Sequence, residues 1–248
     1  MQIKKNSITA IMCVRNESYY LPSFLKHIEP YIDYVIALDD GSTDNTVEIL
    51  EHFPKTLEVL HAEYHEGQDW PERANRLRLI TRARELGVDW VLCCDPDERF
   101  EVRFLRKLRK ITAGEKKCYV VHFRELWGNY RQYRNDGIWD SKQKDILFPL
   151  ADQMTYDYES NHHIPWRYRE LDNQVVKLDY NLYHCKMIRA DHRILRRDLY
   201  NTLDPELKMQ PIGYDYLTET DGIQLKKIPF LRRYDYSTIP ADLRQYKD

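Results

Sequence analysis

Short apolar runs alternate with helix-like segments through the first hundred residues. The runs and the segments between them occupy, in order, residues 8–14, 19–28, 34–38, 46–53, 57–62, 70–86 and 90–94. Strands that alternate with helices in this rhythm are typical of a parallel sheet built from β–α–β units. The pattern therefore predicts an α/β domain with a mostly parallel central sheet and flanking helices.

The segment 70–86 carries a clear helical pattern. Pro71 suits the first helical turn, and Gly87 follows the last one. The apolar residues expected on its buried face are Ala74, Leu77, Ile80, Ala83 and Leu86.

Beyond Phe100 the pattern changes. A basic helix is predicted over residues 101–111, and strands are predicted over 117–126 and 174–185. Residues 127–169, between the strands, are crowded with Tyr, Trp, Asp, Asn and His and show weak periodicity. We expect this stretch to form loops around a site.

The chain shows no internal repeat and no low-complexity linker. We expect one catalytic domain over residues 1–190. Residues 191–248 are more polar, with a helical first part and an extended remainder, and are expected to form a tail that packs on the same domain.

Composition indicates a soluble protein, with 42% hydrophobic and 31% charged residues among 248. The formal net charge of −2 gives the whole chain no attraction for nucleic acid or for an anionic membrane, so any charge effect must be local. No apolar run approaches the roughly 20 residues that a membrane span needs. We expect a cytoplasmic protein without a transmembrane segment, with peripheral contact to a membrane left open.

The five cysteines, at positions 13, 93, 94, 118 and 185, are odd in number. Most lie in apolar, strand-like runs, which favours buried, reduced thiols. A zinc site would be the alternative, but the sequence contains no Cys-Xaa-Xaa-Cys pair to support it.

Polar residues directly follow the apolar runs, and open parallel sheets bind ligands at the carboxyl ends of their strands. In the segment DDGSTDNT after the second run, Gly41 suits a turn and the next hydroxyl and carboxyl side chains suit a helix cap. Capping does not explain Asp39 and Asp40. Two acids at the mouth of an apolar strand suit hydrogen bonding to a base or a ribose.

A second acidic group, Asp95-Pro96-Asp97-Glu98, follows the fourth strand. Carboxylates this close repel one another unless a cation or a set of donors holds them. One possibility is a solvated turn that caps the next helix; the other is a site for Mg²⁺ or Mn²⁺, completed by water and substrate phosphates. We expect Asp97 to lie in a surface turn.

These motifs, in this order, resemble glycosyltransferase family 2 on the GT-A fold. The resemblance rests on VRNE near the N-terminus, DDGSTDNT, an arginine-rich helix and the Asp-Xaa-Asp turn, and covers residues 7–100. It implies transfer of a sugar from a nucleotide-diphosphate donor, linked to UDP, GDP or dTDP, with inversion. The acceptor would be a saccharide, a lipid-linked molecule or another hydroxyl-bearing compound, and the cofactor Mn²⁺ or Mg²⁺.

The resemblance also implies roles for residues. Asp40, with Asp39, would contact the base or ribose, and the turn with Arg15 and Glu17 would line the same pocket. Asp95 would face the ribose or the metal, and Asp97 would bind the cation.

Three further roles are assigned on less specific signals. Either Arg73 or Arg76 could reach the nucleotide, and we favour Arg73 because it is nearer the helix start. His184, at the end of a strand pattern, is the candidate third metal ligand. Glu159, in a cluster of acids and histidines, is the candidate general base, a role that needs a group within reach of the attacking hydroxyl.

Two other functions remain as alternatives. A nucleotidyltransferase shares the sheet and the metal, but its glycine-rich phosphate loop is missing after the first strand. A catalytically silent nucleotide-sugar binding module would keep the site without turnover.

Overall fold

A computed structural model of the chain describes residues 3–62, 72–158, 165–208 and 210–247. Its strands are β1 (Ile8–Val14), β2 (Tyr34–Asp39), β3 (Thr56–His61), β4 (Trp90–Cys93), β5 (Glu98–Phe100), β6 (Cys118–Glu125), β7 (Gln132–Arg134), β8 (Gln143–Pro149), β9 (Val175–His184) and β10 (Leu225–Lys227). Its α-helices are α1 (Leu21–Ile28), α2 (Thr46–Glu51), α3 (Glu72–Glu85), α4 (Val102–Leu105), α5 (Leu108–Thr112), α6 (Ile138–Ser141) and α7 (Ala190–Leu203). Short 3-10 turns are η1 (Glu29–Tyr31), η2 (Arg169–Leu171), η3 (Asp215–Leu217), η4 (Phe230–Arg232) and η5 (Tyr236–Thr238).

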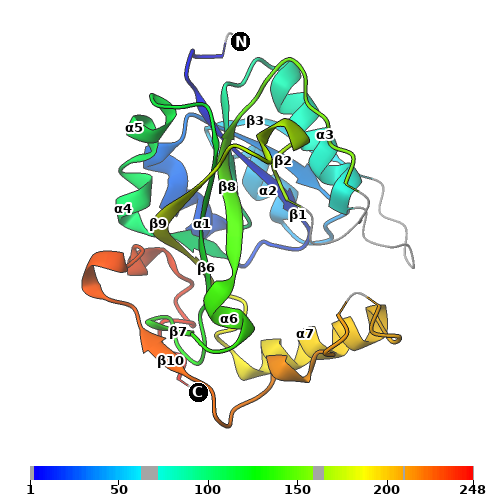
Figure 1. Cartoon of the computed structure of the whole chain (residues 1–248), viewed down its shortest axis with the longest axis vertical. Helices are drawn as coiled ribbons and strands as arrows, with labels where there is room; N and C mark the ends of the chain where they lie inside the picture. Colours follow the sequence, from blue (N-terminus) through cyan, green and yellow to red (C-terminus); the bar gives the residue numbers. More distant parts are fainter. Residues whose placement is uncertain (1–2, 63–71, 159–164, 209, 248) are drawn as a thin grey trace.

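An eight-stranded sheet of order β3-β2-β1-β4-β8-β6-β9-β5 forms the centre of the described chain (Figure 1). β1 pairs in parallel with β2 and β4, and β2 pairs in parallel with β3. β8 is antiparallel to both β4 and β6, while β9 is parallel to β6 and antiparallel to β5. The predicted mostly parallel α/β sheet is confirmed.

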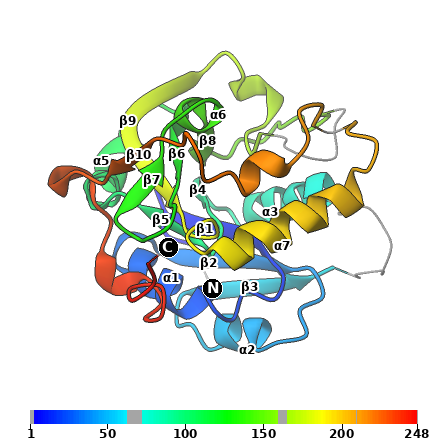
Figure 2. The same cartoon turned by 90° about the horizontal axis from the view of Figure 1, so that it is seen from below.

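Both faces of the sheet are covered at β1, β2 and β4, which explains why these strands are mainly apolar on both sides. Along β1, Ile8, Ala10 and Met12 pack into one core with α1, α4 and α5, whereas Ile11 packs into another with α3. Figure 2 shows α2 and α3 on opposite sides of strands β1 to β3.

The remaining elements lie beyond one end of the sheet. β7, β10, α6 and α7 gather at the bottom of Figure 1, where Trp127 and Trp139 form the centre of a small separate core. The C-terminal segment returns to the sheet, since the Nε of Arg99 on β5 donates to the carbonyl of Thr238 at 2.8 Å. Within the described residues, no helix has both the length and the apolar character to cross a bilayer.

Several local predictions were wrong. The basic helix over 101–111 is interrupted between α4 and α5, where the Lys107 amide donates to Phe104 in a tighter three-residue turn. Residues 127–169 are not loops alone: between loops they contain β7, α6 and the central strand β8, which were not predicted. On α3, Leu77 is exposed while Asn75 is buried, so the buried face differs from the one expected from apolar spacing.

The cysteines behave as predicted. All five thiols are free, four of them buried and Cys13 partly buried. Among the described residues, no three His, Cys, Asp or Glu side chains lie together as a metal site would require.

Candidate active site

The carboxyl ends of β2, β1 and β4 meet at one edge of the sheet because the three strands are parallel neighbours. From β1 the chain proceeds to β2 on one side, and it later returns to β4 on the other side. Such a reversal of strand order leaves a crevice at the carboxyl ends, where α/β proteins bind ligands. The candidate site therefore lies between the segment after β1 and the turn after β4.

Asp39 and Asp40, at the end of β2, are both buried. The Asp39 carboxylate accepts a hydrogen bond from the Ser42 amide at 3.1 Å. The Asp40 carboxylate accepts one from the side-chain amide of Asn75 on α3 at 3.2 Å. A carboxylate has about four acceptor positions, so each side chain retains capacity for a ligand.

The loop after β1 is tied to the loop after β2. Asn16 has a positive φ of 52°, and its side-chain oxygen accepts from the Thr43 amide at 2.8 Å. The Glu17 amide donates to the Thr46 hydroxyl at 2.8 Å, while Arg15 is partly buried beside them. The residues of both predicted nucleotide-contacting motifs thus belong to one hydrogen-bonded unit.

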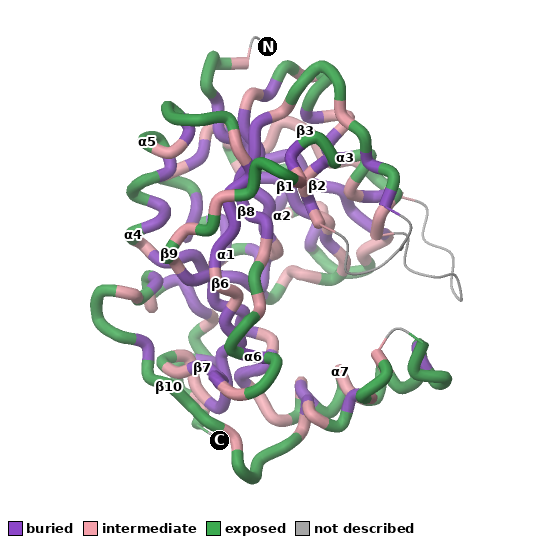
Figure 3. The backbone as a smooth tube through the Cα atoms, viewed as in Figure 1, coloured by how far each residue is buried: buried purple, intermediate pink, exposed green. Residues whose placement is uncertain are grey.

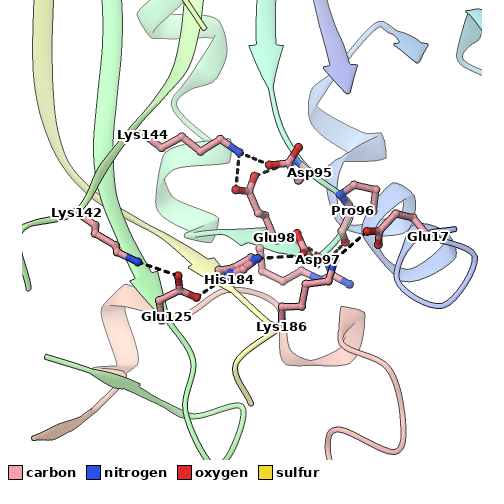
Figure 4. A network of polar contacts seen from close by, with 11 residues as sticks. Glu17, Asp95, Pro96, Asp97, Glu98, Glu125, Lys142, Lys144, His184 and Lys186 are labelled. Atoms are coloured by element: carbon pink, nitrogen blue, oxygen red, sulfur yellow. Dashed lines mark hydrogen bonds and ion pairs between the residues drawn. The ribbon is translucent and has the colours of Figure 1, made fainter. Parts of the chain in front are cut away.

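On one side of the acidic turn, Lys144 of β8 neutralises two carboxylates (Figure 4). Its Nζ lies 2.6 Å from Asp95 Oδ2 and 2.5 Å from Glu98 Oε1. The other oxygen of Glu98 accepts the Asp95 amide at 2.9 Å, which closes the turn. These three side chains form what we call the Lys144 cluster.

On the other side, Asp97 meets His184 and Lys186 from the end of β9. The Asp97 Oδ2 lies 2.9 Å from His184 Nε2 and 3.4 Å from the Lys186 Nζ. Lys186 also contacts Glu17 at 3.1 Å, and His184 Nδ1 lies 2.5 Å from Glu125 on β6. We call these five side chains the His184 cluster; Figure 4 shows it below the Lys144 cluster.

Strand register explains how the His184 cluster assembles. His184 on β9 pairs directly with Glu98 on β5 and with Glu125 on β6. Asp97 precedes Glu98 by one residue, and Lys186 follows His184 by two. The prediction that Asp97 lies in a surface turn was wrong. Asp97 is only 5% exposed, because β9 and the loop after β1 cover it.

Ion pairing and burial compete in this cluster. Burial opposes the charge on His184, but Asp97 and Glu125 outweigh it and raise the pKa of His184 to about 10. Burial also opposes the charge on Asp97, yet His184 and Lys186 hold the pKa of Asp97 well below its usual range. Burial and the nearby Asp97 raise the pKa of Glu17 to about 7 despite Lys186.

A family model described as Glycosyl transferase family 2 matches residues 9–200, well over half of the chain. The chain belongs to glycosyltransferase family 2. This membership and the sheet order agree with the expected GT-A fold.

Individual proteins similar to this family 2 chain are more distant. A TPR repeat-containing protein of Synechococcus elongatus is 30% identical over 115 residues, which are 46% of this chain and 26% of that protein. The chain thus spans about a quarter of the length of this curated relative.

Two solved structures are also similar. Residues 1–349 of TarS from S. aureus match 86% of this chain and 69% of that one, with 16% identity and a TM-score of 0.49. Glucosyl-3-phosphoglycerate synthase from Mycobacterium tuberculosis, in complex with Mn²⁺, UDP and glucosyl-3-phosphoglycerate, matches 49% of this chain and 45% of that one, with 18% identity and a TM-score of 0.33. At these values, neither structure bears on the substrate of this chain.

Arg73 and Arg76 of α3 contact residues of the segment that follows β8. Arg73 donates to the carbonyl of Tyr158 at 2.5 Å. The guanidinium of Arg76 lies 4.5 Å from the centre of the Trp166 ring. It is Asn75 that reaches Asp40, so the choice between the two arginines stays a prediction. Glu159, the candidate general base of the family 2 domain, lies outside the described residues.

Asp97 and His184 offer two donor atoms to a divalent cation, although no group of three described His, Cys, Asp or Glu side chains is placed to hold one. Asp97 Oδ2 and His184 Nε2 are 2.9 Å apart, as are adjacent ligands about 2.1 Å from one octahedral ion. Glu125 accepts a hydrogen bond from the other imidazole nitrogen, Nδ1, and carboxylates commonly accept such a bond from metal-bound histidines. Mg²⁺ or Mn²⁺ would take its remaining ligands from phosphates and water, and Lys186 would have to leave Asp97.

Sequence reasoning missed Lys144, Lys186 and Glu125. Lys144 lies in β8, within the stretch expected to form loops, so no strand was available to point it at the turn. Lys186 follows His184 by two residues, and this spacing at a strand end was a usable signal. Glu125 ends β6, but only its parallel pairing with β9 brings it to His184.

Proposed function

We propose that this family 2 domain transfers a sugar from a nucleotide-diphosphate donor to an acceptor hydroxyl with inversion at the sugar. One observation carries the proposal: Lys186 joins Glu17 and Asp97 across the point where the strand order reverses. This crevice is where α/β folds bind nucleotides. Family membership makes glycosyl transfer the favoured chemistry there.

The nucleotide would lie along the ends of β1 and β2. Asp39 and Asp40 would accept hydrogen bonds from the base and the ribose with the oxygen positions that Ser42 and Asn75 leave available. Arg15 and Glu17 would line the same pocket. The surrounding hydrogen bonds hold these side chains before the ligand arrives, which limits the entropy lost on binding.

Asp97 and His184 would hold the divalent cation, with Asp95 beside them. Glu125 fixes the imidazole by accepting at Nδ1. The Nε2 atom, which lies 2.9 Å from Asp97 Oδ2, would have to lose its proton to bind a metal. When bound, the cation would neutralise negative charge on the departing nucleotide diphosphate.

The diphosphate would meet cationic groups in a neighbouring pocket of about 310 Å³. Its lining includes Glu17, Lys186, Arg189 and His192. Lys186 already forms an ion pair with the Glu17 carboxylate, and a diphosphate oxygen would replace that carboxylate as its partner. Glu159 remains the proposed base that takes the proton from the acceptor hydroxyl.

Calorimetric titration with UDP, GDP, dTDP and CDP tests this proposal, each with Mn²⁺ and again with EDTA. We expect one nucleotide to bind in the micromolar range only with metal, and Asp97→Asn to abolish the metal-dependent part. Glu115→Gln is the matched control, because it also removes one carboxylate. Glu115 is exposed and precedes the first residue of β6, whereas Glu125 of the His184 cluster is the last residue of that strand.

Binding of no nucleotide in either condition would remove the proposed function. Binding without sugar transfer to any acceptor would identify the silent binding module. Release of diphosphate from a nucleoside triphosphate would identify a nucleotidyltransferase.

A further inference from the structure

Two basic segments without acidic residues come together at one side of the molecule. Residues 102–110 contain five Lys and Arg, and residues 223–234 contain four. The Val102 amide donates to the carbonyl of Arg233 at 3.2 Å, and Figure 1 shows the segment after β10 beside α4. A chain with a net charge of −2 thus concentrates positive charge on one local surface.

Two large exposed apolar side chains lie between the basic residues of the second segment. Phe230 and Leu231 are 71% and 68% exposed, on the turn that follows Pro229. The Arg233 guanidinium lies 4.0 Å from the centre of the Phe230 ring. Figure 3 shows the segment as an exposed stretch at the edge of the molecule. Adjacent apolar side chains this exposed commonly mark a contact surface.

Several of the surrounding cations have no internal counter-charge. Arg109 pairs with Asp33, and Arg232 pairs with Asp179. In contrast, Arg106, Lys107 and Lys227 are exposed and make no ion pair with any described residue. The surface therefore carries positive charge that an external partner can neutralise.

We propose that this surface binds an anionic lipid bilayer. We call it the Phe230 patch: Phe230, Leu231, Lys226, Lys227 and Arg233, with Arg106 and Lys107 beside them. Apolar side chains on a protruding turn enter the interfacial region of a bilayer, while flanking Lys and Arg meet lipid phosphates. A protein partner would instead need a pocket shaped for the two side chains. The inference is independent of the proposed sugar transfer.

Co-sedimentation of the full chain with vesicles tests the proposal. We expect the protein to sediment with vesicles of mixed phosphatidylglycerol and phosphatidylcholine, and much less with phosphatidylcholine alone. Raising NaCl from about 0.1 M to about 0.5 M should reduce binding, because screening shortens the reach of the charges.

Two variants separate the apolar and charged parts. Phe230→Ser with Leu231→Ser should weaken the partition coefficient by about tenfold or more, because two buried apolar side chains supply at least that much affinity. Lys226→Gln with Lys227→Gln should weaken it by about fivefold for each charge, on anionic vesicles only.

Leu195→Ser with Leu199→Ser on α7 is the matched control. These leucines are similarly exposed, at 66% and 53%, but lie outside the Phe230 patch, so vesicle binding should not change. Nucleotide binding measured on the Phe230 and Leu231 variant reports separately on the active site and on folding.

Three results would overturn the proposal. They are wild-type protein that stays in the supernatant with anionic vesicles at low salt, equal binding to uncharged vesicles, and a Phe230 and Leu231 variant that sediments as well as wild type. The first result, combined with loss of a co-purifying protein in that variant, would reassign the patch to a protein partner.

Discussion

The Lys144 cluster and the His184 cluster flank the same acidic turn but differ in what holds their carboxylates. Lys144 comes from inside the sheet, its side chain is 14% exposed, and it contacts both Asp95 and Glu98. Lys186 comes from the loop after β9, and its side chain is 38% exposed beside a pocket. The first cluster holds the turn in place, whereas the second leaves Asp97 where a ligand can compete for it.

The difference also shows in the charges. Burial raises the pKa of Glu98 to about 7 even though Lys144 opposes the shift. Asp97, with His184 as well as Lys186, has a pKa held well below its usual range. The pKa values of two neighbouring carboxylates, Asp97 and Glu98, are thus shifted in opposite directions by side chains from strands that are distant in the sequence.

Lys144→Met should produce the largest effect. The substitution leaves Glu98, whose side chain is 1% exposed, without its counter-charge. Breaking a buried pair in this way costs about 3–5 kcal/mol in the free energy of unfolding. Urea unfolding measures the loss, and acidification to about pH 5 should recover part of it by protonating Glu98.

Lys186→Met is the matched comparison. Its side chain is more exposed and Asp97 keeps His184, so we expect a loss of about 1 kcal/mol or less. Equal destabilisation by the two substitutions would contradict the comparison. It would show that Lys186 stabilises the fold as much as Lys144 does.

Glu125→Gln should have the next largest effect, and on ligand binding instead of folding. Glu125 orients His184 without reaching the proposed cation, and loss of such a carboxylate typically weakens metal affinity by about 10–100-fold. Calorimetry with Mn²⁺ and the preferred nucleotide measures the change.

Lys142→Gln provides the control for this substitution. Lys142 contacts the other oxygen of Glu125 at 3.3 Å and is partly exposed, so we expect a several-fold smaller change in affinity. Unchanged metal affinity in Glu125→Gln would mean that His184 does not bind the cation.

Strands β1, β2 and β4 could be predicted from the sequence because each is buried almost throughout and is mainly apolar. The edge strand β3 is only partly buried, and its position between two helical patterns predicted it. The positions of Asp39, Asp40, Asp95 and Asp97 at one edge of the sheet could be predicted because each directly follows an apolar run of the sequence. The position of His184 at the end of β9 was predicted by the same reasoning, and the binding roles of all five residues stay predictions.

The rest depends on pairings that a single sequence does not encode locally. β8 was missed because its apolar part is short and lies in an aromatic, polar stretch, yet it inserts between β4 and β6 and supplies Lys144. Glu125 becomes part of the site only through the register between β6 and β9. Asn75 was not among the residues expected on the buried face of α3, but its amide is buried against Asp40.

His27, a buried histidine outside both clusters, can be compared with His184. Of the predictions, the one on His27 concerns the smallest expected effect, a change of stability with pH. His27 is as buried as His184, but no carboxylate contacts it: its Nε2 accepts from the Phe100 amide at 2.9 Å and its Nδ1 lies 3.3 Å from the Thr238 hydroxyl. Burial, with Arg99 nearby, therefore lowers the pKa of His27 from 6.5 to about 3.

Since the folded-state pKa of His27 lies below its unfolded value, the stabilising contribution is complete above pH 6.5 and is lost as pH falls towards 3. The free energy of unfolding should decrease by at most about 1.4 kcal/mol per pH unit in that range. Urea unfolding of wild type and His27→Gln between pH 6.5 and about 4.5 tests this, with a shallower slope expected in the variant. Equal slopes would mean that His27 takes up its proton without unfolding, and that burial without carboxylates does not keep a histidine of this fold neutral.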